Sequence, residues 1–287
     1  MHTTPRTLAL VGPGRAGTAL ALALVARGTR VVGLSGRSER SVSTRAAVAR
    51  LGAPVRDVAD VGRGADVVLV TTPDAVLTDV ATALAPGLEP GALVVHCSGA
   101  RGLDALAPLA AKRPDVALGA LHPLQTFAHS GPHVLDGVWA AVAGPPVVDD
   151  LATALGLRPF AVPDDRRAAY HAAAAVASNH LVALLGQVDR LAAVAGVPTA
   201  AFAPLVRTTL ANVEASGPAA ALTGPVARGD VATVAAHLAA LDPSERDAYR
   251  ALAGAALVLT GRDDPSLRAL LVGDPVGAPT LVPEAAA

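Results

Sequence analysis

The sequence predicts a doubly wound, mainly parallel α/β domain followed by an all-α domain. Through the first half of the chain, short apolar runs rich in β-branched residues alternate with helical patterns, which is typical of a parallel sheet covered by helices on both faces. Beyond residue 163 only helical patterns follow. We therefore expect an α/β domain over residues 1–163, a helical domain over 164–272 and a loose tail, rich in Gly, Pro and Ala, over 273–287.

The expected strands are the short apolar runs between helical patterns. In chain order they span residues 7–11, 30–34, 66–71, 92–97, 116–121, 137–143 and 158–162. Helices are expected at residues 18–27, directly after the first strand, and at 151–156, before the last one. Parallel neighbours require such crossover helices.

One long helix is expected to open the helical domain. Asp164 and Asp165 can cap a helix that runs from about residue 166 to 195 and stops before Gly196. Its roughly 30 residues would extend about 45 Å. We expect this Ala-rich helix to be buried. Its apolar surface exceeds what a small domain covers, which predicts a two-fold homodimer through the helices after Arg166.

Composition excludes several classes of partner and site. The 287 residues include 23 Lys and Arg against 24 Asp and Glu, a net charge of −1, so we expect neither nucleic acid nor a membrane as a partner. Cys97 is the only cysteine, which excludes an internal disulfide and a cysteine zinc cluster and suits a reducing compartment. With no signal peptide pattern and no uninterrupted window of membrane-spanning length, we expect a cytoplasmic protein without a metal site.

A glycine fingerprint follows the first strand. Gly12, Gly14 and Gly17 fall in a Gly-x-Gly-x-x-Gly pattern that also contains Arg15 and Ala16. Gly12 would make a tight turn, Gly14 would let a pyrophosphate approach the backbone, and Gly17 would allow close packing of the helix on the sheet. The amino end of that helix supplies free N–H donors for phosphates. We therefore expect residues 12–17 to bind a dinucleotide.

The end of the second strand indicates which dinucleotide. A site for NAD places Asp or Glu there, whereas this chain has Ser35, Arg37 and Ser38. An arginine can pair with a 2′-phosphate and serine hydroxyls can donate to it, which favours NADP. The alternative is that Arg37 and the nearby Arg40 are solvated loop cations.

The loops after the third and fourth strands should also face the cofactor, because ligands bind beyond the carboxyl ends of parallel strands. After the third strand these residues are Thr71, Thr72 and Pro73. The next residue, Asp74, either joins them or caps the following helix.

Around Cys97 a hydrolase site is excluded. His96 and Cys97 are neighbours in a predicted strand, so their side chains point to opposite faces and His96 cannot activate the thiol. The segment also lacks the Gly-x-Ser-x-Gly sequence of a nucleophile elbow. Ser98 follows the strand and can contribute a hydroxyl to the cofactor side.

His122 is the first candidate for chemistry. It lies with Pro123 at the end of an apolar strand, and Pro123 keeps it out of helical geometry. A histidine there can donate a hydrogen bond to a carbonyl oxygen or protonate it. The alternative is a histidine that caps backbone carbonyls at the strand end.

Two further candidate groups belong to the helical domain. At 100° per residue, His171, Ser178 and Asn179 share one face of the long helix and His180 lies opposite. Asn179 meets a substrate, a cofactor amide or another helix, and we interpret His171 and His180 as packing residues. Near residue 228, Thr223, Gly224 and Arg228 could bind a carboxylate at a helix amino end, or Arg228 could pair with Asp230 between helices.

The chain resembles the family in which a Rossmann-like domain is followed by a domain of unknown function numbered 2520. The resemblance rests on several segments and covers about residues 5 to 270. They are Gly12 to Gly17, Thr71-Thr72-Pro73-Asp74, Ser98-Gly99-Ala100, His122 to Phe127, Ala177-Ser178-Asn179-His180 and Leu222-Thr223-Gly224-Pro225 to Asp230.

This resemblance implies an NADP-dependent reductase related to pyrroline-5-carboxylate reductases, β-hydroxyacid dehydrogenases and prephenate dehydrogenases. Some members resemble an alternative ketopantoate reductase of pantothenate synthesis. The better-known ketopantoate reductases use a lysine in the helical domain, whereas the only lysine here, Lys112, lies in the first domain. The similar His-Pro turn of prephenate dehydrogenases implies that His122 bonds the reacting oxygen.

The combined hypothesis is hydride transfer from NADPH to a small 2-oxo acid, with 2-dehydropantoate as the leading substrate, in a cleft between the domains. His122 would polarise or protonate the carbonyl with Asn179 and Ser98, and Arg228, Thr223 and Gly224 would hold the carboxylate. Two alternatives stay open. One is reduction of an imine or of another 2-oxo acid, and the other is a sensor that binds a dinucleotide without turnover.

Overall fold

The chain forms two compact units, Met1–His180 and Leu181–Ala287. The computed structural model describes residues 4–128 and 135–272, so the predicted tail at 273–287 lies outside the described residues. The first unit continues beyond residue 163, where we expected the domains to meet. It includes the first part of the long helix, whose side chains contact the end of the sheet.

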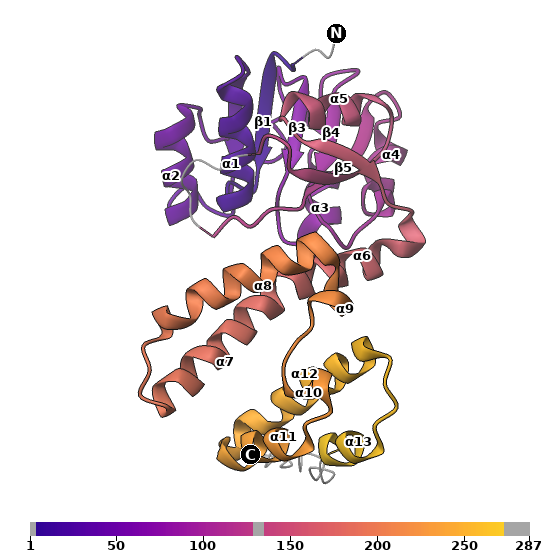
Figure 1. The fold of residues 1–287 in the computed structure, drawn as a ribbon. Coiled ribbons are helices and arrows are strands. Elements are labelled where there is room, and N and C mark those ends of the chain that lie inside the picture. Colours follow the sequence, from indigo (N-terminus) through magenta and orange to yellow (C-terminus); the bar gives the residue numbers. More distant parts are fainter. Residues whose placement is uncertain (1–3, 129–134, 273–287) are drawn as a thin grey trace, which may run out of the picture. The chain divides into compact units, whose positions relative to one another are not determined.

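The first unit contains a seven-stranded sheet in the order β2-β1-β3-β4-β5-β6-β7 (Figure 1). All neighbours are parallel except β5 and β6, so the predicted doubly wound, mainly parallel fold is confirmed. The strands are β1 (Thr7–Val11), β2 (Arg30–Ser35), β3 (Val67–Val70), β4 (Leu93–His96), β5 (Ala117–Pro123), β6 (Trp139–Ala143) and β7 (Arg158–Ala161).

Helices cover both faces of this sheet. They are α1 (Arg15–Val25), α2 (Val42–Leu51), α3 (Leu77–Ala83), α4 (Ala107–Lys112) and α5 (Val147–Ala154). Side chains alternate along each strand, so that Leu8 and Leu10 pack with α1, α2 and α5, whereas Ala9 and Val11 pack with α3 and α4. Both faces are therefore dry, which explains why the strands read as continuous apolar runs.

The long helix is present but is not a uniform α-helix. A 3-10 turn (Asp164–Arg166) leads into α6 (Arg167–Ala175), a π-helical turn (Val176–His180) and α7 (Leu181–Val194). The expectation that it is buried was wrong, because its most apolar window has no buried residue. Asp164–Val194 is also the one described helix that is long and apolar enough to cross a membrane, where we expected none. Length and composition alone support that possibility.

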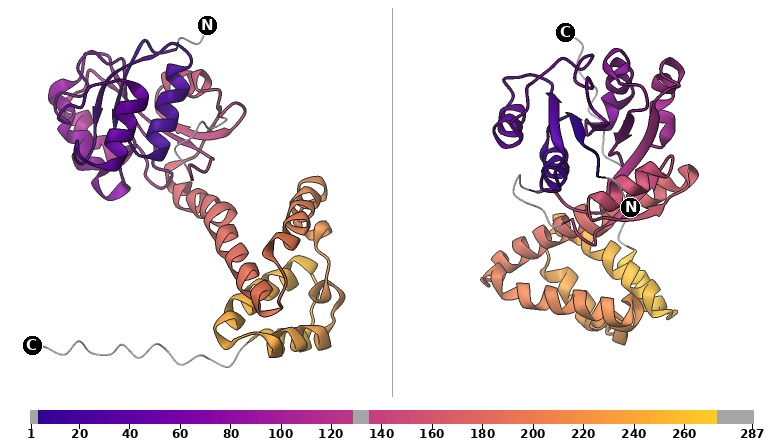
Figure 2. Two further views of the ribbon diagram at one scale, coloured as in Figure 1. Left: turned by 90° about the vertical axis from the view of Figure 1, so that its left-hand side faces the viewer. Right: turned by 90° about the horizontal axis from the view of Figure 1, so that it is seen from above.

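The second unit consists of helices. After α7 come α8 (Ala203–Ser216), α9 (Pro218–Ala221), α10 (Pro225–Arg228), α11 (Val231–Ala240), α12 (Pro243–Thr260) and α13 (Pro265–Leu271) (Figures 1 and 2). Its core joins Val226, Val234, Leu238, Leu257 and Leu267 from the last four of these helices.

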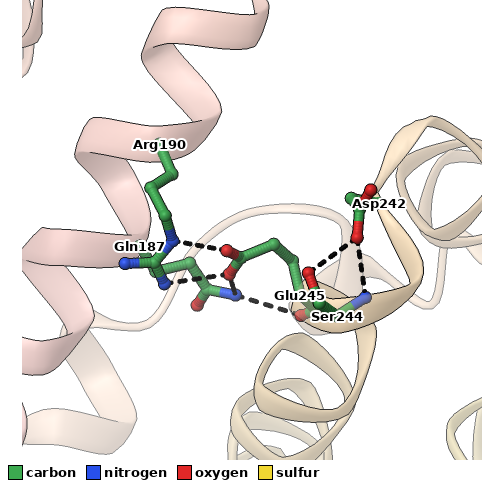
Figure 3. Close-up of polar contacts among 5 residues, drawn as sticks. All are labelled: Gln187, Arg190, Asp242, Ser244 and Glu245. Atoms are coloured by element: carbon green, nitrogen blue, oxygen red, sulfur yellow. Dashed lines mark hydrogen bonds and ion pairs between the residues drawn. The ribbon is translucent and has the colours of Figure 1, made fainter.

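A polar cluster attaches α7 to the start of α12 (Figure 3). Gln187 is buried and donates to the backbone oxygen of Glu245 at 3.0 Å, and Arg190 donates to the Glu245 carboxylate through Nε and Nη2. Hydrogen bonding to Arg190 lowers the pKa of Glu245. At the same helix end, Asp242 accepts from the backbone N–H of Ser244. These contacts join α7 to α12 and pair the polar groups of Gln187 and Glu245.

Candidate active site

The carboxyl ends of β1, β2 and β3 border a pocket of about 600 Å³. Its lining comes from the glycine turn after β1, the loop after β2 and the loop after β3. Among the predicted cofactor residues these are Gly12, Gly14, Ser35, Arg37, Thr71, Thr72 and Pro73. The three loops predicted from the sequence to face the cofactor therefore line one pocket.

The glycine turn has the geometry that the fingerprint predicts. Gly12 has φ +83°, and a Cβ there would lie 2.8 Å from the backbone of Thr71 and Thr72. A Cβ at Gly17 would lie 3.0 Å from the Gly12 oxygen, whereas the side of Gly14 is open. Only glycine fits at Gly12 and Gly17, which keeps the turn close to the β3 loop.

The pocket offers donors to an anionic ligand. Helix α1 starts at Arg15, so the N–H groups of its first turn, including those of Ala16 and Gly17, have no acceptor within the helix. The hydroxyl oxygen of Thr72 is buried and has no partner among the described residues. The Arg15 guanidinium points elsewhere and donates to the Ala128 oxygen at 2.9 Å. A dinucleotide pyrophosphate fits these free N–H donors.

At the β2 end, the predicted phosphate-binding residues separate. Arg37 is exposed, lines the pocket and has no hydrogen-bond or ion-pair partner within the described ranges, whereas Ser35 is buried in the pocket wall. Ser38 accepts from the backbone of Arg40 and is not part of the lining. Two hydroxyls that the sequence analysis missed, those of Ser41 and Ser43 around the start of α2, also line the pocket. They follow Arg37 closely enough in sequence to have been included.

Around β4 the structure agrees with the exclusion of a hydrolase. His96 and Cys97 lie on opposite faces of the sheet, and burial raises the pKa of the Cys97 thiol to about 12. His96 is fully buried and bonds the Gly102 oxygen at 3.1 Å. The hydroxyl of Ser98 accepts from the Arg101 backbone N–H. His96 and Ser98 therefore shape the loop after β4.

His122 lies at the carboxyl end of β5, where its ring is partly covered. Its Nδ1 is 2.7 Å from the hydroxyl of Tyr170 on α6, and the rings of His122 and His171 meet edge to face. A Cβ at Gly99 would lie 2.8 Å from Nε2 of His122. Gly99 therefore packs closely against the His122 and His171 rings, where a larger residue would clash. Among the described residues, His122 bonds the Tyr170 hydroxyl and not a backbone carbonyl, whereas His96 bonds the Gly102 carbonyl.

Electrostatics favour a neutral imidazole at His122. Burial, helped by the nearby His171 and Arg167, lowers the pKa of His122 from 6.5 to about 4. Burial also raises the pKa of Tyr170 to about 12, so its phenol keeps the proton. When Tyr170 donates to Nδ1, the remaining imidazole proton lies on Nε2. Of the two roles expected from the sequence, hydrogen-bond donation is the one that a neutral ring supports directly.

Arg167, which the sequence analysis missed, lies at the start of α6. Its side chain is 1% exposed and its Nε donates to Asp164 Oδ1 at 3.0 Å. Asp164 was expected to cap the helix, but no side-chain cap is formed there and its carboxylate pairs with Arg167 instead. The i, i+3 spacing of these opposite charges was a usable signal.

The polar face around Asn179 was predicted with the period of a regular α-helix, which does not apply here. Val176–His180 is a π-helical turn, in which i→i+5 bonding replaces the 100° step. Asn179 and His180 are exposed, and Ser178 is half-buried. His171 is not a core residue but lies against His122. The role of Asn179 stays a prediction.

The second candidate group lies in the other unit. Thr223, Gly224 and Arg228 surround α10, and the side chains of Thr223 and Arg228 are exposed. No Arg228–Asp230 ion pair is formed in the described chain. Asp230 instead caps α11 by accepting from Thr233, which lowers its pKa. Binding of a carboxylate by Arg228, Thr223 and Gly224 stays a prediction.

Among the described residues, no three His, Cys, Asp or Glu side chains are placed to hold a metal ion.

Two family comparisons match the chain in succession. Residues 3–123 match the Rossmann-like domain, and residues 137–256 match the domain of unknown function DUF2520. No curated protein matches the sequence.

Solved structures share the fold at low identity. BF3122 of Bacteroides fragilis, described as a candidate NADP oxidoreductase, is 23% identical, with a TM-score of 0.77 over 89% of this chain and 99% of that chain. TM1727 of Thermotoga maritima is 22% identical, with a TM-score of 0.65 over 88% and 98%. An imine reductase of Streptomyces aurantiacus is 18% identical, with a TM-score of 0.54 over 92% of each chain.

Proposed function

Since this chain belongs to the family in which a Rossmann-like domain precedes a DUF2520 domain, we propose that it is an oxidoreductase that uses a nicotinamide dinucleotide to reduce a small 2-oxo acid. The observation that carries this proposal is the His122 imidazole, hydrogen-bonded to Tyr170, in the same unit as the glycine pocket. A hydride from the reduced nicotinamide is the chemistry that the cofactor supplies when bound.

His122 acts on the oxygen of the substrate carbonyl. Negative charge grows on that oxygen as the carbonyl is reduced, and a preorganised donor in a partly dry site stabilises it. Tyr170 holds Nδ1, so the Nε2–H of His122 is the donor. A neutral imidazole can act in this way without becoming charged first, and the oxygen takes its proton from solvent water as the alcohol forms. Ser98 and Asn179 are proposed to orient the substrate.

NADP is the proposed form of the cofactor. The pocket wall at the β2 end carries Arg37 together with the hydroxyls of Ser41 and Ser43, and no carboxylate lines it. An unpaired arginine and hydroxyl donors favour a 2′-phosphate, whereas a ribose diol would be held by a carboxylate. The likeness to BF3122, itself described as a candidate NADP oxidoreductase, agrees with this choice.

The proposed substrate is 2-dehydropantoate, which would be reduced to pantoate. The resemblance in sequence to the alternative ketopantoate reductases supports this substrate, and a small acid suits a site with one polarising histidine and the nearby Arg167. A catalytic lysine in the helical unit is excluded, since Lys112 is in α4 of the first unit. The chemistry therefore depends on His122.

We also propose a homodimer formed through the helical unit. Helix α8 has no buried residue, and Leu205 and Leu210 are 63% and 46% exposed. Isolated helices of this length are marginal in water, so apolar packing must stabilise it. Light scattering at micromolar concentration should give twice the chain mass, and an active monomer would refute the dimer.

A substrate screen tests the proposed function. Loss of NADPH absorbance is followed with a panel of 2-oxo acids, including 2-dehydropantoate, and with cyclic imines such as pyrroline-5-carboxylate. We expect turnover with 2-dehydropantoate. Turnover with imines alone would reassign the substrate, and tight NADPH binding without turnover on any compound would leave a dinucleotide-binding sensor.

A further inference from the structure

Arg167 carries a buried charge that the protein only partly satisfies. Its Nε donates to Asp164, but Nη1 and Nη2 are buried and have no hydrogen-bond partner among the described residues. Asp164 is itself 61% exposed, so it offers Arg167 a largely solvated carboxylate on one side only. An unpaired buried charge is costly, and proteins retain one where a ligand or ordered water completes it.

Arg167 lies at the same end of the sheet as His122. Asp164, its partner, lies against Gly102 in the loop after β4, since a Cβ at Gly102 would be 2.7 Å from the Asp164 carboxyl carbon. The positive charge of Arg167 also acts on His122 and His96 and lowers the pKa of both imidazoles. Arg167 therefore lies near the carboxyl ends of β4 and β5, whereas the glycine turn follows β1.

The planar pair of unpaired donors on Arg167 indicates the kind of ligand that fits it. Nη1 and Nη2 of a guanidinium form a planar pair of donors that matches the two oxygens of a carboxylate. Arg250 also has a buried unpaired nitrogen but differs, because that atom is Nε and its outer Nη1 contacts Asp247 at 3.5 Å on the surface. In Arg167 both outer nitrogens are buried and lack hydrogen-bond partners among the described residues.

We propose that Arg167 binds the carboxylate of the small acid whose carbonyl meets His122. This inference rests on the proposed function and specifies it, because it requires the substrate to be an acid and assigns the anion to the first unit. It also gives Arg167 the role that the sequence analysis assigned to Arg228. Both Nη atoms are covered in this structure, so the atoms over them shift when the carboxylate enters.

The test uses an equilibrium measurement in addition to turnover. Oxamate carries the carboxylate of a 2-oxo acid but is not reduced, and oxamide is its neutral counterpart. Binding of each to the full-length protein with NADPH is followed by NADPH fluorescence. We expect Arg167→Met to weaken oxamate binding by at least about 30-fold, as for removal of one partner of a buried charge pair. Arg167→Lys, which keeps the charge without the planar fork, should lose about tenfold, and oxamide binding should not change.

The stability of the ligand-free variants gives an independent readout. If the Arg167 guanidinium is paired only when an anionic ligand binds, replacing it by the apolar side chain of methionine leaves the melting temperature of the ligand-free protein unchanged or raises it. A structural ion pair with Asp164 predicts a lower melting temperature instead. The control is Arg166→Met, at the exposed neighbouring position on the same turn, which should change neither oxamate binding nor stability.

The outcomes separate this inference from the proposed function. If oxamate binds through Arg167 and no 2-oxo acid is turned over, the carboxylate site stands and the proposed function fails. If 2-dehydropantoate is reduced and Arg167→Met leaves its KM unchanged, the function stands and the inference is overturned. Absence of oxamate binding to the unmodified protein, or its loss in Arg228→Met but not in Arg167→Met, also overturns it.

Discussion

The loops at the carboxyl ends of the sheet and the polar residues of the second unit differ in how their buried polar atoms are paired. In the first unit Thr72 and Arg167 keep buried polar atoms without partners among the described residues. In the second unit Asp230 caps α11 and Glu245 is held by Gln187 and Arg190, and Arg250 Nε is the only buried polar side-chain atom without a partner among the described residues there. Buried polar groups that lack partners indicate where a ligand belongs, whereas paired groups are explained by the fold.

The largest expected effect lies at His122. If His122 donates to the carbonyl oxygen, His122→Ala should lower kcat by about 10²-fold or more, with little change in NADPH affinity, because the imidazole is not part of the pocket lining. His122→Asn keeps a donor and should fall between the two proteins. Steady-state kinetics and melting temperatures are measured on the same samples. Normal turnover by folded His122→Ala would refute the catalytic assignment.

Cofactor preference gives the next effect. The unmodified protein should bind NADPH at least about ten times more tightly than NADH, a difference of about 1.4 kcal/mol. Arg37→Asp should reduce or reverse this ratio, because it replaces the cation in the pocket lining by an anion. Arg40→Asp is the matched control, since Arg40 lies outside the lining. Fluorescence titration measures both affinities, and equal values for the unmodified protein would contradict NADP specificity.

A smaller effect is expected at Tyr170, which positions His122. Tyr170→Phe removes the hydroxyl 2.7 Å from Nδ1 and keeps the ring, so kcat should fall by about tenfold while NADPH affinity stays constant. The ¹⁵N shifts of the His122 ring provide the decisive readout. We expect the Nε2–H tautomer in the unmodified protein and a mixture in Tyr170→Phe. An unchanged tautomer would leave Tyr170 with a packing role only.

Acid should destabilise the first unit through its buried histidines. The pKa values of His96 and His122 are about 4 in the folded chain, against 6.5 ordinarily. Between these values the unfolded chain binds protons that the folded chain does not, so stability falls as the pH falls. Urea unfolding at pH 7 and pH 5 should show a smaller decrease for His122→Asn. An equal decrease in both proteins would mean that His122 is not shifted.

The smallest effect comes from the paired group of the second unit. Asp230→Ala removes the cap of α11 and should lower the melting temperature by about 2–4 °C without changing NADPH affinity. Asp230→Asn is the matched control, because asparagine caps as well as aspartate. A marked loss of NADPH affinity in Asp230→Ala would break the distinction between the two units.

Local sequence patterns were sufficient to predict the fold and the loops that line the glycine pocket. Period, glycine spacing and strand ends are properties of neighbouring residues, and they predicted the strands within a few residues and brought the turn at Gly12 to the loop at Thr72. Strand β1 was predicted with its observed bounds, Thr7–Val11. His122 lies at the end of β5, where the carboxyl-end rule predicted it, and its role stays a prediction.

What the sequence determined by itself, therefore, was the order of the elements, the glycine turn and the position of His122 at a strand end. Tertiary structure decided which side chains surround that histidine. Tyr170 and Arg167 are far from His122 along the chain, and only the packing of α6 on the end of the sheet brings them near it. Burial also changed the chemistry, since the pKa of an imidazole depends on the solvent that the folded chain excludes, which no local pattern records.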